Sequence, residues 1–181
     1  FNDAWPRVRL DLVCKSSPKL LERLAKGEID LALTTETDTP ANAERLITDE
    51  LVWVGCAGGR APRETPLPVA ITDGTCTFRA AMIAGLERAG RDWRVVGPLG
   101  TQDALLATLE ADIAVASLLR SSVPAHIDIL DGAYDLPKLM PFHINLYSRT
   151  SQTNAIVREL AGHIRDQIQR RFQTVPQRKA G

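Results

Sequence analysis

Hydrophobic and polar residues alternate with two periods along this chain, one typical of strands and one typical of helices. Residues 7–15 have a period of two. Val8, Leu10, Leu12 and Cys14 fall on one side, and mostly charged residues fall on the other. This alternation predicts a strand at the start of the chain.

A short helix is predicted directly after this segment. Ser16 and Ser17 stand before a proline, which is typical of a helix start, and Ser17 is a candidate for the cap. Three leucines form an apolar stripe, and Gly27 is the expected end of the helix. The aliphatic run at 29–33 predicts a strand covered on both faces, so residues 7–33 predict strand, helix and strand with a parallel crossover.

The remaining residues continue the α/β pattern in two groups. Residues 34–45 are polar and predict a loop, and residues 50–59 predict a strand that ends in glycines. Residues 60–68 contain three prolines and predict a linker between two lobes. Further strands are predicted at 69–71, 93–97, 112–117 and 143–148, and helices at 77–89, 102–110 and 152–172.

Composition narrows the class of protein. The chain has 181 residues, 44% of them hydrophobic and 24% charged, which suits one large domain or two small lobes with a buried core. Its formal net charge is zero, so we do not expect it to bind nucleic acid by itself. It contains no apolar run of about 20 residues, so no membrane association is predicted. It begins with Phe1 and lacks signal-peptide features, so we expect a longer protein whose N-terminal part is missing here.

Few residues suggest chemistry. The three cysteines form no C-x-x-C pair and predict reduced thiols in a cytoplasmic protein, with Cys14 beside Lys15 as the alternative, a redox sensor. The three histidines are far apart, so neither a metal nor a cofactor is expected. The sequence has no G-x-S-x-G motif and no glycine-rich phosphate loop, so an enzyme is not expected.

Two predicted turns from strand to helix suit ligand binding. The first is at 15–18 and the second at 72–79. Each offers hydroxyl groups and unpaired backbone N–H groups at a helix start, where an anion is stabilised. In α/β sheets ligands bind outside the carboxyl ends of strands, so the two turns are expected to line one cleft if the lobes face each other.

Residues 8–33, VRLDLVCKSSPKLLERLAKGEIDLAL, resemble the start of the effector-binding domain of LysR-type transcriptional regulators. Gly27, Glu28, Ile29, Asp30 and Leu31 carry the pattern. Residues 101–119, TQDALLATLEADIAVASLL, look like the second signature of the family. They depart from it because residues 110–112 stand where glycines are common and because Leu-Leu replaces the usual Leu-Pro.

This resemblance implies a two-lobed periplasmic-binding-protein type II fold with a ligand cleft between the lobes. Lobe I would comprise residues 1–66 and 142–181, and lobe II residues 67–141. The function implied is to bind a small anionic effector and to transmit this to an absent N-terminal winged helix-turn-helix, the only part that would contact DNA. A homodimer is implied for the domain and a tetramer for the full-length protein, in the cytoplasm of a bacterium.

The candidate site residues lie on the predicted turns and on the strand ends. The competing interpretations are helix capping for Ser17, loop polarity for the threonines at 34–35, and a solvated helix position for Arg79. The effector-binding candidates are Ser16, Ser17, Thr34, Thr35, Thr75, Thr77, Phe78, Arg79, Thr101 and Gln102. By resemblance, the dimer-interface candidates are Leu21, Leu24, Trp53, Met82 and Leu86.

Two other classes compete with a regulator. A solute-binding protein of a transporter has the same fold, but it would need an export signal, and its free cysteines would be unusual outside the cytoplasm. An enzyme on this scaffold would need a nucleophile or base in the cleft, and the sequence suggests none.

Overall fold

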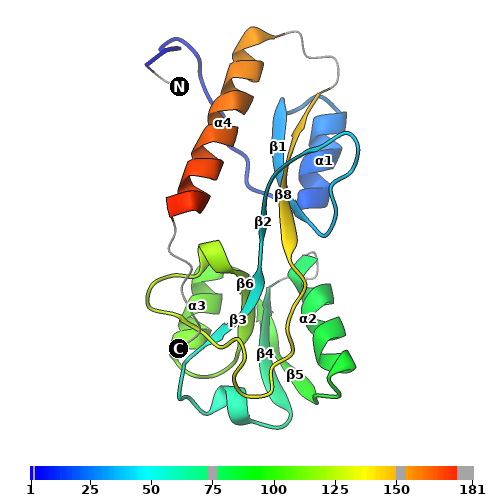
Figure 1. Cartoon of the computed structure of the whole chain (residues 1–181), viewed down its shortest axis with the longest axis vertical. Helices are drawn as coiled ribbons and strands as arrows, with labels where there is room; N and C mark the ends of the chain where they lie inside the picture. Colours follow the sequence, from blue (N-terminus) through cyan, green and yellow to red (C-terminus); the bar gives the residue numbers. More distant parts are fainter. Residues whose placement is uncertain (2, 73–76, 150–153, 175–181) are drawn as a thin grey trace. The chain divides into compact units, whose positions relative to one another are not determined.

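The computed structural model describes residues 1, 3–72, 77–149 and 154–174 of the chain. It divides into two compact α/β units, labelled by element in Figure 1. The first unit comprises Phe1–Thr48 and His143–Pro176, and the second comprises Asp49–Phe142. The chain therefore passes between the units twice, after Thr48 and after Phe142.

The first unit contains a three-stranded sheet and two helices. The strands run in the order β1 (Leu31–Glu36), β8 (Phe142–Ser148) and β2 (Glu44–Asp49), and β1 is antiparallel to β8. Helix α1 (Ser17–Ala25) packs on β1, and α4 (Ala155–Thr174) is the last helix.

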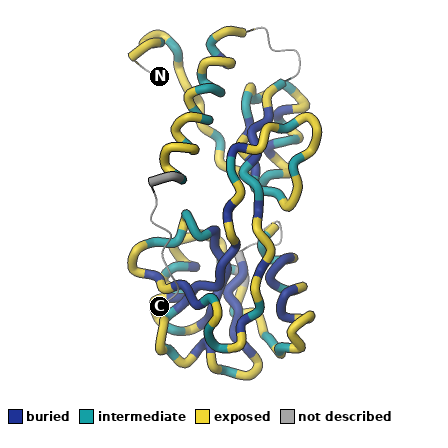
Figure 2. The backbone as a smooth tube through the Cα atoms, in the orientation of Figure 1, coloured by how far each residue is buried: buried dark blue, intermediate teal, exposed yellow. Residues whose placement is uncertain are grey.

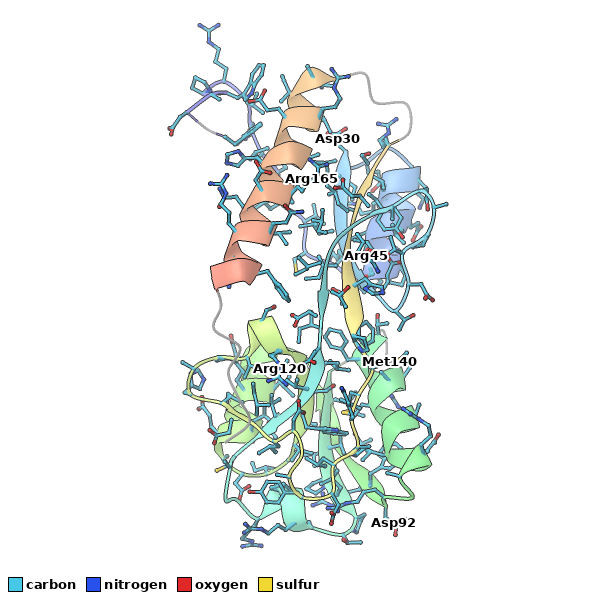
Figure 3. All side chains as sticks on the ribbon, viewed as in Figure 1. Asp30, Arg45, Asp92, Arg120, Met140 and Arg165 are labelled. Carbon is cyan, nitrogen blue, oxygen red and sulfur yellow. The ribbon has the colours of Figure 1, made fainter. Side chains whose placement is uncertain are left out.

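The core of the first unit lies under α1. Leu20 and Leu24 of this helix pack with Ala32 of β1 and Tyr147 of β8, two residues that are paired across the sheet on the face that α1 covers. On the other side of the unit, Arg165 of α4 forms an ion pair with Glu44 at the start of β2 (Figure 3).

The second unit contains the other strands and helices. Its first sheet has the order β6 (Ala116–Leu119), β3 (Leu51–Gly55) and β7 (Asp128–Ile129), and its second pairs β4 (Leu67–Thr72) in parallel with β5 (Trp93–Leu99). Val69 of β4 also forms a parallel bridge with Val115. The remaining elements are α2 (Thr77–Arg88), α3 (Gln102–Glu110), and the short 3-10 helices η1 (Ala61–Arg63) and η2 (Arg120–Ser122).

The second unit holds the larger apolar core. All five residues of β3 are buried, as are Leu105 and Leu109 of α3 and the run of residues 114–119 (Figure 2). This packing follows from the sequence, because continuous aliphatic runs can be covered on both faces whereas alternating ones cannot.

Glycines and apolar periodicity located the helices correctly. Helix α1 ends before Gly27, whose φ of 72° is the left-handed conformation that glycine adopts without strain. Helix α2 likewise ends before Gly90, with φ of 62°. The predicted helix at 102–110 coincides with α3, and the predicted final helix overlaps α4 over most of its length.

The strand predicted at residues 7–15 is wrong. This segment forms no strand, and Leu12 on its apolar side is 95% exposed. The reason is the absence of a pairing partner, since β1 forms its ladder with β8. The predicted parallel crossover is therefore absent from the described residues. The strand predicted at 29–33 begins at Leu31 and runs to Glu36, with Leu33 exposed rather than covered.

The predicted loop and linker are also corrected. Residues 34–45 include the end of β1 and the start of β2. Residues 60–68 do not form an exposed linker, because they hold η1, with Ala61 and Pro62 buried, and the start of β4. Residues 49–66 accordingly belong to the second compact unit, whereas the sequence placed them in the first lobe. The strand predicted at 112–117 begins only at Ala116.

Candidate functional site

Helix α1 is preceded by a serine whose hydroxyl has no hydrogen-bond partner among the described residues. Ser16 is the residue before the helix, with φ −63° and ψ 151°, and its carbonyl accepts the N–H of Leu20 at 3.0 Å. Its hydroxyl makes no capping bond, and the oxygen is buried without a hydrogen-bond partner among the described residues. A buried polar atom in this state is unusual and is often completed by a water or a ligand.

Ser17 joins the start of α1 to the end of β1. Its Oγ accepts a hydrogen bond from the backbone N–H of Thr35 at 3.1 Å. Capping of the helix by Ser17, the competing interpretation, is wrong because Ser16 occupies the cap position. The structure thus brings together Ser16, Ser17 and Thr35, three of the predicted residues.

The fourth predicted residue of this unit, Thr34, lies in the interior. It is 2% exposed, and its hydroxyl donates to the carboxylate of Glu36 at 2.7 Å. Neighbouring residues of a strand point to opposite faces, so Thr34 and Thr35 cannot share one role. The hydroxyl of Thr34 belongs to the buried face, and its expected contact with an effector does not fit this position.

Glu36 collects a network of hydrogen bonds that the sequence did not reveal. Its carboxylate accepts from Thr34, from the Asn145 side-chain amide at 2.8 Å and from the Tyr147 hydroxyl at 2.9 Å. Thr39 donates to the Asn145 side-chain oxygen at 2.9 Å. Burial of the phenol and its hydrogen bond to the Glu36 carboxylate raise the pKa of Tyr147 to about 12. The sequence feature that could have revealed this network is the pairing of Thr34 with Asn145 across β1 and β8. Recognising that pairing requires the register of the two strands, which the sequence alone does not give.

The second unit has a pocket at the first turns of two helices. Its volume is about 150 Å3. Phe78 and Arg79 come from α2, Gln102 from the start of α3, and Ser117 from β6. Its apolar wall includes Met82 and Leu105, and Phe78 also stacks edge-on against Phe142 at 5.1 Å.

Arg79 provides the charge of this pocket. The side chain is partly buried, and no carboxylate pairs with it among the described residues. Elsewhere in the same unit the guanidinium of Arg120 is held by two carboxylates. An arginine without a partner at the first turn of a helix favours an anion, because both the side chain and the helix end are positive.

Two predicted residues of the second unit, Thr77 and Thr101, are not part of the lining of this pocket. Thr77 is exposed. Thr101 caps α3, because its Oγ1 accepts the N–H of Ala104 at 3.2 Å. Thr75 lies outside the described residues. Ser117 was missed because it follows a run of small and aliphatic residues, and only the fold aims it at the helix starts.

Comparison with known proteins decides the family. The LysR substrate binding domain matches residues 1–169. The chain belongs to this family.

A curated LysR-type relative extends beyond this domain. The HTH-type transcriptional regulator DgdR of Burkholderia cepacia is 32% identical over 165 residues, which cover 91% of this chain and 56% of the relative. The chain therefore spans about half the length of that regulator.

Solved LysR regulatory domains share the fold. The CcmR regulatory domain of Synechocystis PCC6803 in complex with 2-PG superposes with a TM-score of 0.71 at 16% identity, covering 91% of this chain and 86% of that one. The effector binding domain of QuiR in complex with shikimate gives 0.62 at 14%, covering 82% and 76%. The periplasmic-binding-protein type II fold expected from the sequence is confirmed.

Most of the residues predicted for a LysR dimer interface are core residues. Trp53, Met82 and Leu86 are at most 2% exposed, and Leu24 is 9% exposed. Their side chains fill the units and offer almost no surface to a partner, so the interface expected on them does not fit their positions. Leu21 is partly exposed and remains a candidate.

Neither a metal-binding cluster nor a membrane-spanning helix is found among the described residues. No group of three or more His, Cys, Asp or Glu side chains among them could hold a metal ion. None of the helices within these ranges is long and apolar enough to cross a membrane.

Proposed function

We propose that this chain is the effector-sensing domain of a LysR-type transcriptional regulator and that its effector is a small anion. One observation carries the proposal: Arg79 lies in a pocket without a carboxylate partner among the described residues. A partly buried guanidinium is stabilised by an anion, and arginine binds carboxylates and phosphates with two parallel hydrogen bonds.

The rest of the pocket supports a small and partly polar ligand. Gln102 can donate or accept through its amide, and Ser117 through its hydroxyl, so both can orient an anionic group. Phe78, Met82 and Leu105 supply apolar contact. A volume of about 150 Å3 restricts the part of the effector held here to a few heavy atoms.

In the first unit we propose Ser16 as an effector-contacting group. Its buried oxygen has no partner among the described residues, so a ligand donor or acceptor there would complete its hydrogen bonding. Ser17 and the backbone of Thr35 hold the turn in place rather than contact the ligand, because they are bonded to each other.

The role of the whole protein is proposed from the family. DNA contact through an N-terminal helix-turn-helix, a homodimer of this domain, a tetramer at full length and a cytoplasmic location agree with the match to a curated regulator. Effector binding would then shift an existing equilibrium between regulator states. We propose no catalytic step, since the family is a class of regulator domains.

A solute-binding protein of a transporter is the competing function. It would share the fold and an arginine pocket, but the family match and the curated relative favour the regulator.

Binding to the isolated chain tests the proposal. Thermal shift and calorimetry would screen acetate, succinate, benzoate, shikimate, inorganic phosphate and glycerol 3-phosphate. We expect at least one of these anions to raise the melting temperature of the wild type. Arg79→Gln should weaken its binding about tenfold or more, because a charge-assisted hydrogen bond to a ligand is lost.

The matched control is Arg88→Gln, since Arg88 is an exposed arginine of the same helix and, among the described residues, its side chain is hydrogen-bonded only to the carbonyl of Ala84. Binding that is equally weak in both variants, or that is unchanged in Arg79→Gln, would contradict the proposed role of the pocket.

A further inference from the structure

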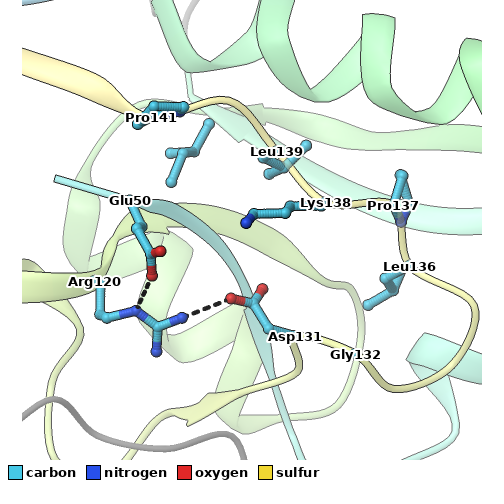
Figure 4. Close-up of a pocket in the computed structure, with 10 residues that line it drawn as sticks. Glu50, Arg120, Asp131, Gly132, Leu136, Pro137, Lys138, Leu139 and Pro141 are labelled. Carbon is cyan, nitrogen blue, oxygen red and sulfur yellow. Dashed lines mark hydrogen bonds and ion pairs between the residues drawn. The ribbon is translucent and has the colours of Figure 1, made fainter.

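A second and larger pocket lies in the second unit, away from Arg79. Its volume is about 400 Å3, within the usual range for small-molecule sites. One side is formed by Glu50, Leu51 and Arg120, and the other by the segment 131–141 (Figure 4). It shares no lining residue with the pocket at the helix starts.

Ion pairs of Arg120 connect the two sides of this pocket. The Nε of Arg120 pairs with Glu50 at 2.7 Å, and its Nη2 pairs with Asp131 at 2.8 Å. The side chain of Arg120 is only 20% exposed, whereas that of Glu50 is 57% exposed. Glu50 therefore keeps a carboxylate surface that a ligand can reach.

The surrounding backbone is fixed by Trp53. Its N–H donates to Asp131 at 3.0 Å, and its indole donates to the carbonyl of Pro137 at 2.8 Å. Trp53 is 1% exposed and packed in the core of the unit. Both ends of the 131–137 segment are therefore anchored to one buried residue, Asp131 by its backbone N–H and Pro137 by its indole, and the pocket is preformed rather than shaped by a mobile loop.

Lys138 places an ammonium group over the pocket. Figure 4 shows its side chain extending from the 131–141 segment over the space beside Glu50 and Asp131. The lysine is exposed and forms no ion pair with any residue that the structure describes. The lining thus contains two cations and two carboxylates, and its formal charge is zero.

We propose that this pocket binds a small zwitterion with an apolar side chain, such as an α-amino acid. Its ammonium would contact Glu50 and its carboxylate would contact Lys138. Leu136 and Leu139, at 8% and 6% exposure, would cover the side chain together with Leu51. A simple anion or cation would leave the pocket with an unbalanced charge, whereas a zwitterion leaves it neutral.

The position of the pocket suggests regulation. Glu50 and Leu51 follow directly after the first passage of the chain between the units, and Pro141 stands just before the second. A ligand bound in this pocket would contact both connecting segments, at residues 50–51 and at Pro141. Because it binds away from Arg79, this site is independent of the proposed effector pocket and would act as a second input.

Three probes that share a 3-methylbutyl group test the charge argument on the chain of 181 residues. L-leucine carries both charges, 4-methylpentanoate only the carboxylate, and 3-methylbutylamine only the ammonium. Calorimetry should show that the wild type binds leucine about tenfold or more tightly than either of the others. Hydrogen exchange should slow at residues 50–51 and 136–141 when leucine is present.

Two variants should change which of the three probes the pocket prefers. Glu50→Gln makes the formal charge of the lining positive, so it should lose leucine binding about tenfold and prefer 4-methylpentanoate. Lys138→Gln makes it negative and should prefer 3-methylbutylamine. Both side chains are largely exposed, so folding should be retained, which a melting curve would check.

Lys19→Gln is the control for lost charge, since Lys19 is an exposed lysine of α1 in the first unit. Arg79→Gln is the control for the other pocket and should bind leucine like the wild type. The proposal is overturned if leucine does not bind, if it binds no better than the two single-charge probes, or if Arg79→Gln abolishes its binding.

Discussion

In the first unit the carboxylate of Glu36 accepts hydrogen bonds from three side chains, whereas in the second unit the guanidinium of Arg79 has no carboxylate partner among the described residues. Glu36 ends strand β1 and Arg79 lies in the first turn of α2, and sequence alone gives no reason to treat the two charges differently. The first is a satisfied structural network, and its removal should destabilise the fold. The guanidinium of Arg79 lacks such a network among the described residues, so replacing Arg79 should affect ligand binding while leaving the fold stable.

Asn145→Ala should have the largest effect. Asn145 is fully buried and donates to Glu36 and to the carbonyl of Asp38. Its removal leaves a charged acceptor with fewer donors and opens a cavity, so the free energy of unfolding should fall by about 2–4 kcal/mol. Urea denaturation would measure this. Asn42→Ala, at an exposed turn, is the control and should change stability by less than about 0.5 kcal/mol.

Arg79→Gln should leave the stability of the fold almost unchanged. Because Arg79 has no carboxylate partner among the described residues, its replacement should change the free energy of unfolding by less than about 0.5 kcal/mol in the same urea experiment. A loss as large as that of Asn145→Ala would show that Arg79 is structural and would remove the contrast.

Tyr147→Phe should cost about 1 kcal/mol at neutral pH, the usual contribution of a buried hydrogen bond. It should also change the dependence of stability on pH. The pKa of Tyr147 rises from 10 to about 12 in the folded state, so its stabilisation is complete below pH 10 and is lost between pH 10 and 12. Unfolding curves at pH 9 and pH 11.5 should show the gap between wild type and variant narrowing. A constant gap would contradict this assignment.

The smallest expected difference in stability is between variants at the N-terminal caps of α3 and α1. Thr101→Ala removes the cap bond to Ala104 and should cost about 1 kcal/mol, the usual value for a capping side chain. Ser16→Ala removes a hydroxyl that bonds to nothing among the described residues, so stability should change by less than about 0.5 kcal/mol. Equal losses from thermal melts of the two variants would show that Ser16 caps its helix after all.

The sequence predicted the helices better than the strands, for a physical reason. Helix α1 is specified by the residues around it, namely a serine and a proline at its start and Gly27 after its end. A strand is specified by a partner elsewhere in the chain. Residues 7–15 alternate well, yet they form no strand because no ladder includes them.

The candidate site shows the same limit. Phe78, Arg79 and Gln102 stand at predicted helix starts, and local signals were sufficient to name these three residues of the pocket lining. Glu36 was missed because its partners Asn145 and Tyr147 are 109 and 111 residues away. No local pattern gives that register. The burial of Thr34 was not predicted for the same reason, since the face of a strand that is buried depends on what covers it.

The discontinuity of the first unit has a consequence for biosynthesis. The ribosome releases residues 49–142 as one continuous stretch, so the second unit can fold when its last residue appears. The first unit cannot, because β1 pairs with β8, which is translated about a hundred residues later. Until β8 has been translated, the carboxylate of Glu36 remains hydrated. The leucines of α1 that pack with Tyr147 remain exposed to solvent during the same time. A nascent chain that has emerged from the ribosome as far as residue 142, but no further, should therefore contain a folded second unit and an N-terminal segment that attracts chaperones.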